Sequence, residues 1–214
     1  MKKDKKMKNN LKNIAYTTLK ERLINCEYEP GSVLKEADLA QELGISRTPV
    51  REAISLLEAE EYLIIAPKKG IFVTDISLND VIQIFQVRME IEPITLKMAG
   101  PNLPIDELVK WRTKFENSPT DLKDSYKVDG EMHLFIIEHC NNKYIIDMMN
   151  TVFDKNARIV ISSKQNLSHV KHAKEEHIEI LNSLIKQDFN LAAEQMFAHI
   201  ANCRKASIDY FYSV

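Results

Sequence analysis

Two short helical segments separated by a four-residue turn constrain this chain more than any other feature. Apolar spacing predicts a helix over 36–43, and Gly44 ends it because glycine readily takes the left-handed conformation that closes a helix. A second helix is predicted over 46–60. Ser46 is a favoured N-cap, and Pro49 falls in the first turn, where a missing N–H costs little. The pattern predicts a helix-turn-helix.

The flanking segments extend this motif into a complete domain. Apolar residues at helical spacing predict an earlier helix over 11–26. After residue 60, two β-prone runs, 62–65 and 71–74, flank the sequence PKKG, which predicts a hairpin with lysines and a glycine at its tip. Three helices followed by a two-stranded hairpin describe a winged helix-turn-helix over residues 11–76.

The rest of the chain reads as helix. Five glycines and seven prolines leave few tight turns. Periodicity and breaker residues predict six helices over 78–99, 104–117, 121–140, 142–163, 168–186 and 188–212. The fold class is therefore mainly α: an N-terminal winged helix-turn-helix followed by an all-α bundle of about six helices over 77–214. Residues 1–10 are lysine-rich with little to bury, and a disordered basic tail is predicted there.

Charge and cysteine content indicate how the chain could bind DNA and in which compartment it is expected. Residues 1–76 carry 13 Lys/Arg against 12 Asp/Glu, and the remainder carries 16 against 19, so DNA binding would depend on the placement of basic groups rather than on bulk charge. Three scattered cysteines indicate a reducing compartment. No apolar run approaches the roughly 20 residues of a membrane span, and the basic segment MKKDKKMKNN has no apolar segment after it, so we do not expect it to be a secretory signal. We expect a cytoplasmic, nucleoid-associated bacterial protein with no membrane partner.

The second helix of the motif carries the candidate groups for reading DNA. Arg47 and Arg51 lie four residues apart and share one helix face, where guanidinium groups can bond guanine in the major groove. Ser46 and Thr48 add hydroxyls near the helix N-terminus, suited to phosphate. The alternative is that the arginines are surface residues paired with nearby glutamates; Glu52 and Glu58 are the candidates.

The tip of the hairpin carries a second set. Lys68 and Lys69 would approach the DNA backbone or the minor groove, and Gly70 would allow a close approach.

Buried polar groups in the helical region suggest a metal site. Asp129 and His133 are one turn apart on one helix face, and His177 and His199 lie on the apolar faces of two later helices. A bundle could bring the four together, and a divalent transition metal would compensate their burial. The alternative is a set of separately hydrogen-bonded core histidines. The other three histidines lack an apolar face and are predicted to face solvent: His139, His169 and His172.

Residues 11–76 resemble the winged helix-turn-helix of the GntR family of bacterial transcriptional regulators. The resemblance rests on PGSVLKEADLAQELGISRTPVREAISLLEAEEYL followed by PKKGIFVT, with SRTPVREA as its specific core. It implies DNA contacts from Arg47, Thr48, Arg51 and the wing residue Gly70. The chain departs from many members at two positions: Glu61 replaces a common glycine, and Ala37 replaces an arginine that contacts DNA in some members.

Residues 78–214 resemble the all-helical FCD effector-binding domain of one GntR branch, in its shorter, VanR-like form. The resemblance implies that Asp129, His133, His177 and His199 bind a metal such as Zn, Ni or Mn. It also implies that Arg88, in the stretch VRMEIEP, binds a carboxylate effector. The alternative for Arg88 is an ion pair with Glu92 on the helix surface.

These expectations combine into one function. The chain is expected to be a homodimeric repressor, not an enzyme, that binds a short palindromic operator in double-stranded DNA. A small organic or sugar-acid carboxylate bound at the metal and Arg88 would control it. Two other functions stay open at this point. One is a metal-dependent hydrolase in which the Asp-His₃ group activates water, and the other is a scaffold whose core histidines bind no ligand.

Overall fold

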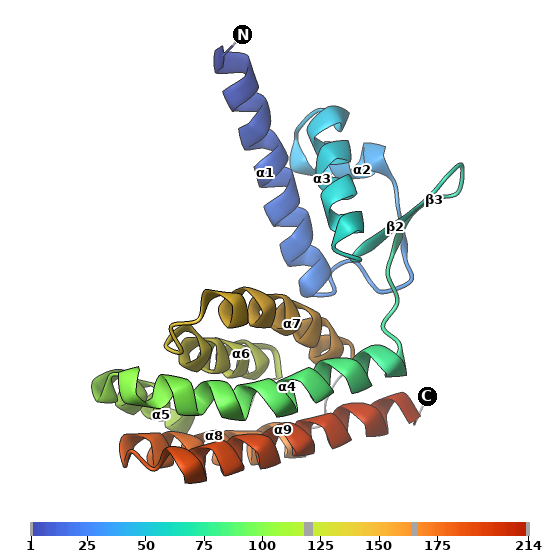
Figure 1. Ribbon diagram of the computed structural model, residues 1–214. Helices are drawn as coiled ribbons and strands as arrows, with labels where there is room; N and C mark the ends of the chain where they lie inside the picture. Colours follow the sequence, from blue (N-terminus) through green and yellow to red (C-terminus); the bar gives the residue numbers. More distant parts are fainter. Residues whose placement is uncertain (1, 118–121, 164–166, 213–214) are drawn as a thin grey trace. The chain divides into compact units, whose positions relative to one another are not determined.

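The chain divides between Ile76 and Ser77 into two structural units. The computed structural model describes residues 2–117, 122–163 and 167–212 (Figure 1). Each unit has its own core. Among the described residues, no helix is long and apolar enough to cross a membrane.

The first unit is built on three helices, α1 (Lys2–Ile24), α2 (Glu36–Leu43) and α3 (Arg47–Ala59). Both α1 and α2 pack against α3. The α3 side chains that face this core repeat at helical spacing, as the sequence predicts. These buried α3 residues are Val50, Ala53, Ile54 and Leu57.

Helix α1 begins at Lys2, within the segment predicted as a disordered tail. The difference has a simple physical origin. Leu19 and Leu23 anchor the helix in the core. Once a helix is nucleated, each further lysine adds a backbone hydrogen bond at low cost.

The turn between α2 and α3 forms as its sequence predicts. Gly44 takes the left-handed conformation, with φ 65°, and its N–H donates to the carbonyls of Ala40 and Gln41. Ser46 occupies the N-cap position of α3, but its side chain makes no capping hydrogen bond. The Ser46 hydroxyl is therefore not used to close the helix.

The wing is a small antiparallel sheet of β1 (Val33–Leu34), β2 (Leu63–Ala66) and β3 (Gly70–Val73), in the order β1-β3-β2. The predicted hairpin is present, with Ile64 opposite Phe72. The two-residue strand β1, which the sequence analysis did not predict, covers the other edge of β3. Glu61 precedes β2 with φ 63°, a left-handed conformation that glycine adopts more readily than glutamate.

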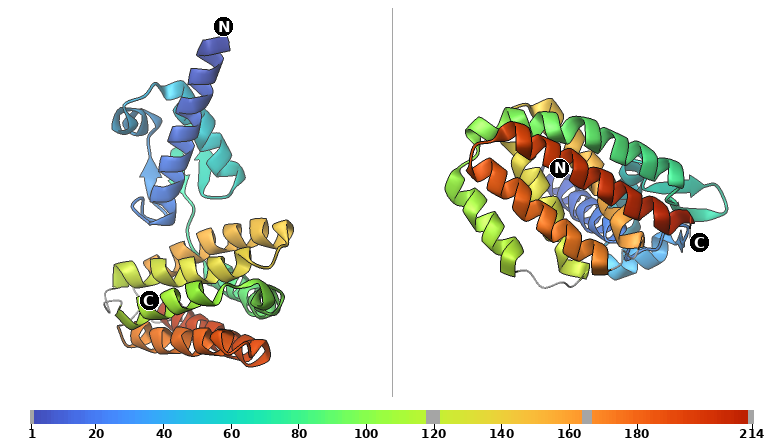
Figure 2. Two further views of the ribbon diagram at one scale, coloured as in Figure 1. Left: turned by 90° about the vertical axis from the view of Figure 1, so that its left-hand side faces the viewer. Right: turned by 90° about the horizontal axis from the view of Figure 1, so that it is seen from below.

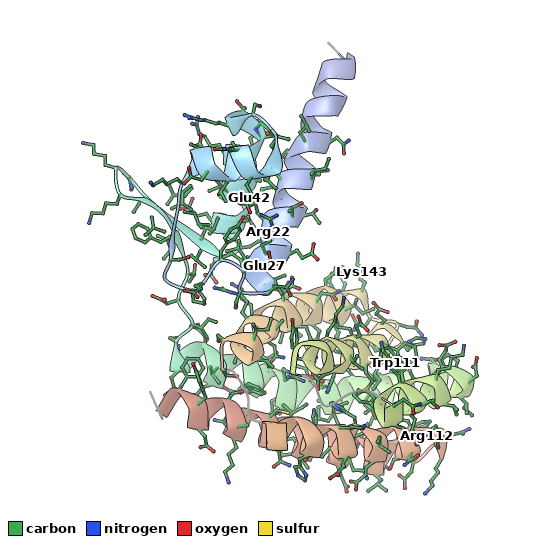
Figure 3. The ribbon with its side chains drawn as sticks, turned by 180° about the vertical axis from the view of Figure 1, so that it is seen from behind. Arg22, Glu27, Glu42, Trp111, Arg112 and Lys143 are labelled. Atoms are coloured by element: carbon green, nitrogen blue, oxygen red, sulfur yellow. The ribbon has the colours of Figure 1, made fainter. Side chains whose placement is uncertain are left out.

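A charged contact joins the helices of the first unit at their surface. Arg22 of α1 pairs with Glu42 of α2 and lies 3.6 Å from Glu27 (Figure 3). Tyr28 bonds to both Arg22 and Glu42, at 3.0 and 2.9 Å. These contacts fix α2 against α1, and hence the position of the turn that leads into α3.

The second unit is an all-α bundle. Its helices are α4 (Leu78–Ala99), α5 (Ile105–Asn117), α6 (Leu122–Glu138), α7 (Lys143–Ser162), α8 (Leu167–Ile185) and α9 (Phe189–Tyr212), with a 3₁₀ turn at Gly100–Asn102. A capping box between Ser77 and Asp80 starts α4. Helix α4 lies along α9 and also contacts α6 and α7, while α8 packs between α5 and α9 (Figures 1 and 2).

The interior of this bundle is partly polar. Arg112 of α5 donates to Asn182 of α8 at 3.2 Å near the surface (Figure 3). Deeper in the bundle, α4 buries Arg88, Glu92 and Thr95 among its apolar residues. Burying charge is costly unless the groups are paired, so this polar interior marks the part of the bundle where a functional site is expected.

Candidate metal centre and nucleic-acid interface

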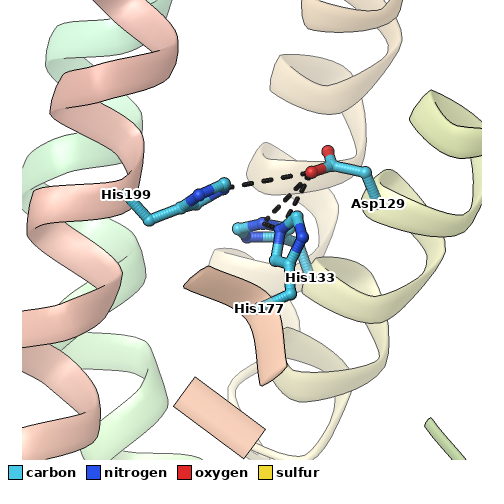
Figure 4. A group of neighbouring side chains, drawn as sticks. All are labelled: Asp129, His133, His177 and His199. Carbon is cyan, nitrogen blue, oxygen red and sulfur yellow. Dashed lines mark hydrogen bonds and ion pairs between the residues drawn. The ribbon is translucent and has the colours of Figure 1, made fainter. Parts of the chain in front are cut away.

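The four predicted metal ligands converge inside the bundle. Asp129 and His133 come from α6, His177 from α8 and His199 from α9, and their side chains point toward one another (Figure 4). One ligand atom from each residue lies within 4.8 Å of all the others. The helical spacing of Asp129 and His133 places both side chains on one face of α6. The packing of α6, α8 and α9 brings the other two ligands, His177 and His199, to the same point.

The donor atoms are arranged as around a common centre. The Oδ1 atom of Asp129 lies 2.9 Å from the Nε2 of His177 and 3.9 Å from the Nε2 atoms of His133 and His199. The Nε2 atoms of His133 and His177 are 3.2 Å apart. Donors bound about 2.0–2.2 Å from one ion lie about 3–4 Å from each other, so this donor set fits a transition metal.

Two carboxylates hold the outer nitrogens of the histidines. Glu92 bonds to the Nδ1 of His133, and Glu176 bonds to the Nδ1 of His199 at 2.8 Å. Glu176 is itself held by Asn202 at 2.5 Å. An acceptor at Nδ1 fixes a histidine in the tautomer whose Nε2 is free to bind a metal. Both carboxylates were missed as partners of the centre by the sequence analysis.

The charges in this cluster are strongly coupled. Burial opposes the charge on Asp129, but the three histidines hold the pKa of its carboxyl group well below the usual range. Burial and the neighbouring His199 lower the pKa of His177 to about 4. Burial also opposes a charge on His199, yet its contacts with Cys203 and Glu176 and the charge of Asp129 raise its pKa to about 10. Without metal at neutral pH, His177 is therefore neutral and His199 is protonated.

Arg88 lies beside this cluster, and its side chain is only 2% exposed. Its Nε donates to Glu92 at 2.6 Å and its Nη1 to Asn156 at 3.1 Å. The ring of Phe153 lies 4.7 Å from the guanidinium carbon. The ion pair with Glu92 considered in the sequence analysis is present, but it is buried rather than on the surface. Among the described residues, Nη2 of Arg88 has no hydrogen-bond partner.

The remaining histidines stand apart from the four ligands. His139 is half-buried, and its Nδ1 lies 2.8 Å from the carbonyl oxygen of Phe135. His172 is exposed and reaches Glu176 at 3.2 Å. The side chain of His169 lies outside the described residues.

The predicted DNA-reading residues lie together on the exposed side of α3. Ser46, Arg47, Thr48 and Arg51 are all exposed, while Pro49 and the core residues of α3 are buried. The N-cap and the first two turns of α3 therefore project two guanidinium groups and two hydroxyls away from the core. This is the part of a recognition helix that reaches base edges in helix-turn-helix proteins.

Arg51 is held by a residue that the sequence analysis did not name. Its Nε and Nη2 atoms donate to the two carboxylate oxygens of Glu36, at 2.9 and 2.8 Å. Glu58, one of the two partners considered, instead accepts a hydrogen bond from the backbone N–H of Ile65. Glu36 opens α2, fifteen residues before Arg51, so only the packing of α2 on α3 reveals the pair.

The wing residues occupy the turn between β2 and β3. Lys68 and Lys69 are both exposed. Lys68 has φ 65° and Gly70 has φ 119°, so the turn depends on left-handed backbone at both positions, and glycine is the residue best suited to this at Gly70. The two ammonium groups are thereby carried at the tip of the hairpin.

Comparison with protein families matches both units. The model described as "Bacterial regulatory proteins, gntR family" matches residues 11–73, and the FCD domain model matches residues 83–202. The second match alone covers more than half of the chain.

Individual proteins are similar over nearly the whole length. An uncharacterised HTH-type transcriptional regulator of Bacillus subtilis (strain 168), YdhC, is 23% identical over 86% of this chain and 85% of its own length. The Uxu operon transcriptional regulator of Escherichia coli (strain K12) is 25% identical over 90% of this chain and 84% of its own. A crystal structure of a transcriptional regulator GntR from Rhodococcus sp. RHA1, 16% identical, has the same fold, with a TM-score of 0.80 over 94% of this chain and 98% of that one.

Proposed function

The chain belongs to the gntR family of bacterial regulatory proteins, in the branch that carries an FCD domain, and from this premise we propose that it is a metal-containing repressor controlled by a small carboxylate. It is a transcriptional regulator of this type rather than an enzyme, like its named relatives, so the hydrolase alternative is set aside. The convergence of Asp129, His133, His177 and His199 beside Arg88 carries the proposal.

The first unit would bind the operator. Arg47 and Arg51 would bond guanine edges in the major groove, and Ser46 and Thr48 would bond phosphates. Lys68, Lys69 and Gly70 would follow the backbone or enter the minor groove. One recognition helix reads few base pairs, so we propose a homodimer on a short palindrome, in which the two half-sites together supply the necessary specificity.

The second unit would bind metal and effector together. Asp129 and the three histidines would hold Zn, Ni or Mn, and the bound metal would supply a Lewis acid that attracts a carboxylate. Nη2 of Arg88 is buried without a partner among the described residues. A carboxylate from an organic or sugar acid would satisfy that N–H group with a charge-assisted hydrogen bond.

Control of DNA binding requires that the effector bind two states of the dimer unequally. A coupling free energy of about 1–3 kcal/mol between two sites is typical and suffices for a 5- to 150-fold change in operator affinity. A thermal-shift screen of organic acids, with and without added Zn²⁺, Ni²⁺ or Mn²⁺, tests the proposal. A hit should shift the melting temperature only when metal is present and should change operator affinity.

Metal binding should release a proton at neutral pH. His199 has a pKa raised to about 10 and must lose its proton to coordinate, whereas His177, with a pKa lowered to about 4, has no charge to lose. From pH 7 toward pH 10 metal affinity should therefore rise by about tenfold per pH unit, as proton competition at His199 weakens. Calorimetric titration with Zn²⁺ in two buffers of different ionisation enthalpy measures the released proton. Identical heats in both buffers would contradict the prediction.

Replacing Glu92 by glutamine should weaken the metal centre without removing a ligand. A glutamine cannot accept from both Arg88 and His133, so the His133 ring loses its fixed tautomer, and zinc affinity should fall about 10- to 100-fold. Competition titration with a chromogenic chelator measures the change. Glu176→Gln should act similarly through His199, whereas Glu175→Gln, an exposed neighbour, should leave the affinity unaltered. Wild-type affinity in Glu92→Gln would show that Glu92 does not support the centre.

A further inference from the structure

The pair between Arg51 and Glu36 has a geometry that leaves one edge of the guanidinium available. Glu36 occupies the Nε and Nη2 side, with both bonds shorter than 3.0 Å. The two N–H groups of Nη1 and the outer N–H of Nη2 remain, because a guanidinium has five donors in a fixed plane. A bidentate bond to O6 and N7 of guanine can be made with one donor from each of the two terminal nitrogens. Glu36 and a guanine base can therefore bind the same arginine at once.

Exposure places the pair at the surface that would meet DNA. The side chain of Arg51 is 69% exposed, and that of Glu36 is 25% exposed. An exposed ion pair contributes little to folding stability. Its more useful consequence is that it holds a long side chain, otherwise free to rotate, in one orientation before DNA arrives.

We propose that Glu36 is a specificity-determining residue, which orients Arg51 toward one guanine of the operator and weakens its binding to phosphate. The proposal rests on the proposed function, since it assumes that Arg51 reads a base. The proposal adds an acidic residue of α2 that makes the contact between Arg51 of α3 and the base selective.

Two effects of the carboxylate act in the same direction. By fixing the guanidinium plane before DNA binds, Glu36 lowers the conformational-entropy cost of ordering Arg51 on the correct base. By placing a negative charge beside Arg51, it also repels the phosphate backbone, which attracts every sequence alike. The operator is favoured and random DNA is disfavoured, so Glu36 raises the ratio of the two affinities.

The test uses the full-length protein and an operator selected from random duplexes. Affinity is measured for that operator, for the same duplex with the contacted guanine replaced, and for random DNA. Glu36→Gln keeps the size of the side chain but removes its charge, and the specificity ratio should fall about tenfold. Binding to random DNA should become about twofold tighter, because one repulsive charge is lost within the Debye length.

Two further variants separate this role from a structural one. Asp38→Asn removes the same charge from an exposed position on α2 and should keep the wild-type specificity ratio. In an Arg51→Ala background, Glu36→Gln should no longer change that ratio, because the two residues act as one unit. A general loss of folding would instead lower binding to all three duplexes together, and circular dichroism of each variant detects it.

Three outcomes would overturn the proposal. Glu36→Gln could leave the specificity ratio unchanged while binding all duplexes more tightly, which would make Glu36 a competitor of DNA. The variant could leave both the ratio and the affinities unchanged. The effect of Glu36→Gln on the ratio could also persist in the Arg51→Ala background. If Arg51→Ala itself leaves operator binding unchanged, the assignment of the recognition helix in the proposed function fails instead, so the two failures are distinguishable.

Discussion

Replacing His177 by alanine is expected to abolish stoichiometric metal binding. His177 is 2% exposed, and its Nε2 is the nitrogen closest to Asp129, at 2.9 Å. Without it, the centre keeps only three donors, and the half-buried carboxylate of Asp129 loses its nearest partner. Elemental analysis of the purified protein, dialysed against a metal-free buffer, measures the loss. His139→Ala is the matched control, because it removes the histidine that follows α6, whose ring lies against Phe135 and bonds a backbone carbonyl rather than the centre.

The same substitution should also lower thermal stability, and the part of this loss that comes from the metal can be measured separately. A ligand present at about 100 times its dissociation constant stabilises the folded state by about 2.7 kcal/mol. For a protein of this size, that corresponds to a fall of about 5–10 °C in melting temperature. After treatment with a chelator, the difference between the wild type and His177→Ala should shrink by this amount, and what remains reflects the cavity and the lost contact with Asp129. If His177→Ala contains as much metal as the wild type, the assignment of this metal site is wrong.

Helix positions in this chain were predictable because the signals that set them are local. The predicted ranges 36–43 and 78–99 coincide with α2 and α4. Gly44 ends α2 through its own backbone preference, and the capping box of Ser77 and Asp80 starts α4 within four residues. Such signals do not depend on the rest of the fold, so they can be read directly from the sequence.

Strand β1 shows where local reasoning ends. Two residues, Val33 and Leu34, cannot display an alternating pattern, and they form a strand only because β3 lies beside them. The start of α1 is a similar case, since the core contacts of its later turns stabilise a helix whose first residues have no apolar pattern of their own.

The candidate site divides in the same way. Asp129 and His133 share a helix face by spacing alone, but their meeting with His177 and His199 depends on how three helices pack. The carboxylates that bond the outer nitrogens of the histidines were harder still to predict from the sequence. Glu176 precedes His177 in the chain, yet successive helical residues point about 100° apart, and Glu176 bonds His199 on another helix.

The second large effect is expected at the recognition helix. Arg47→Ala and Arg51→Ala should each weaken operator binding by about 1–3 kcal/mol, and each should relax the preference for one base pair. Both side chains are exposed on α3, so truncation to alanine, a good helix former, should leave the fold intact. Fluorescence anisotropy with a selected operator, and with single-base variants of it, measures both quantities.

A wing variant separates base reading from charge. Lys69→Ala removes one exposed cation from the tip of the hairpin and should weaken binding to all sequences about equally, with the salt dependence of binding reduced by about one phosphate contact. The arginine variants should instead lose more affinity for the operator than for random DNA. This contrast decides the role of α3, because a chain with a net charge of −2 gains little from bulk attraction to DNA. If both arginine variants bind the selected operator as tightly as the parent, another part of the first unit reads the bases.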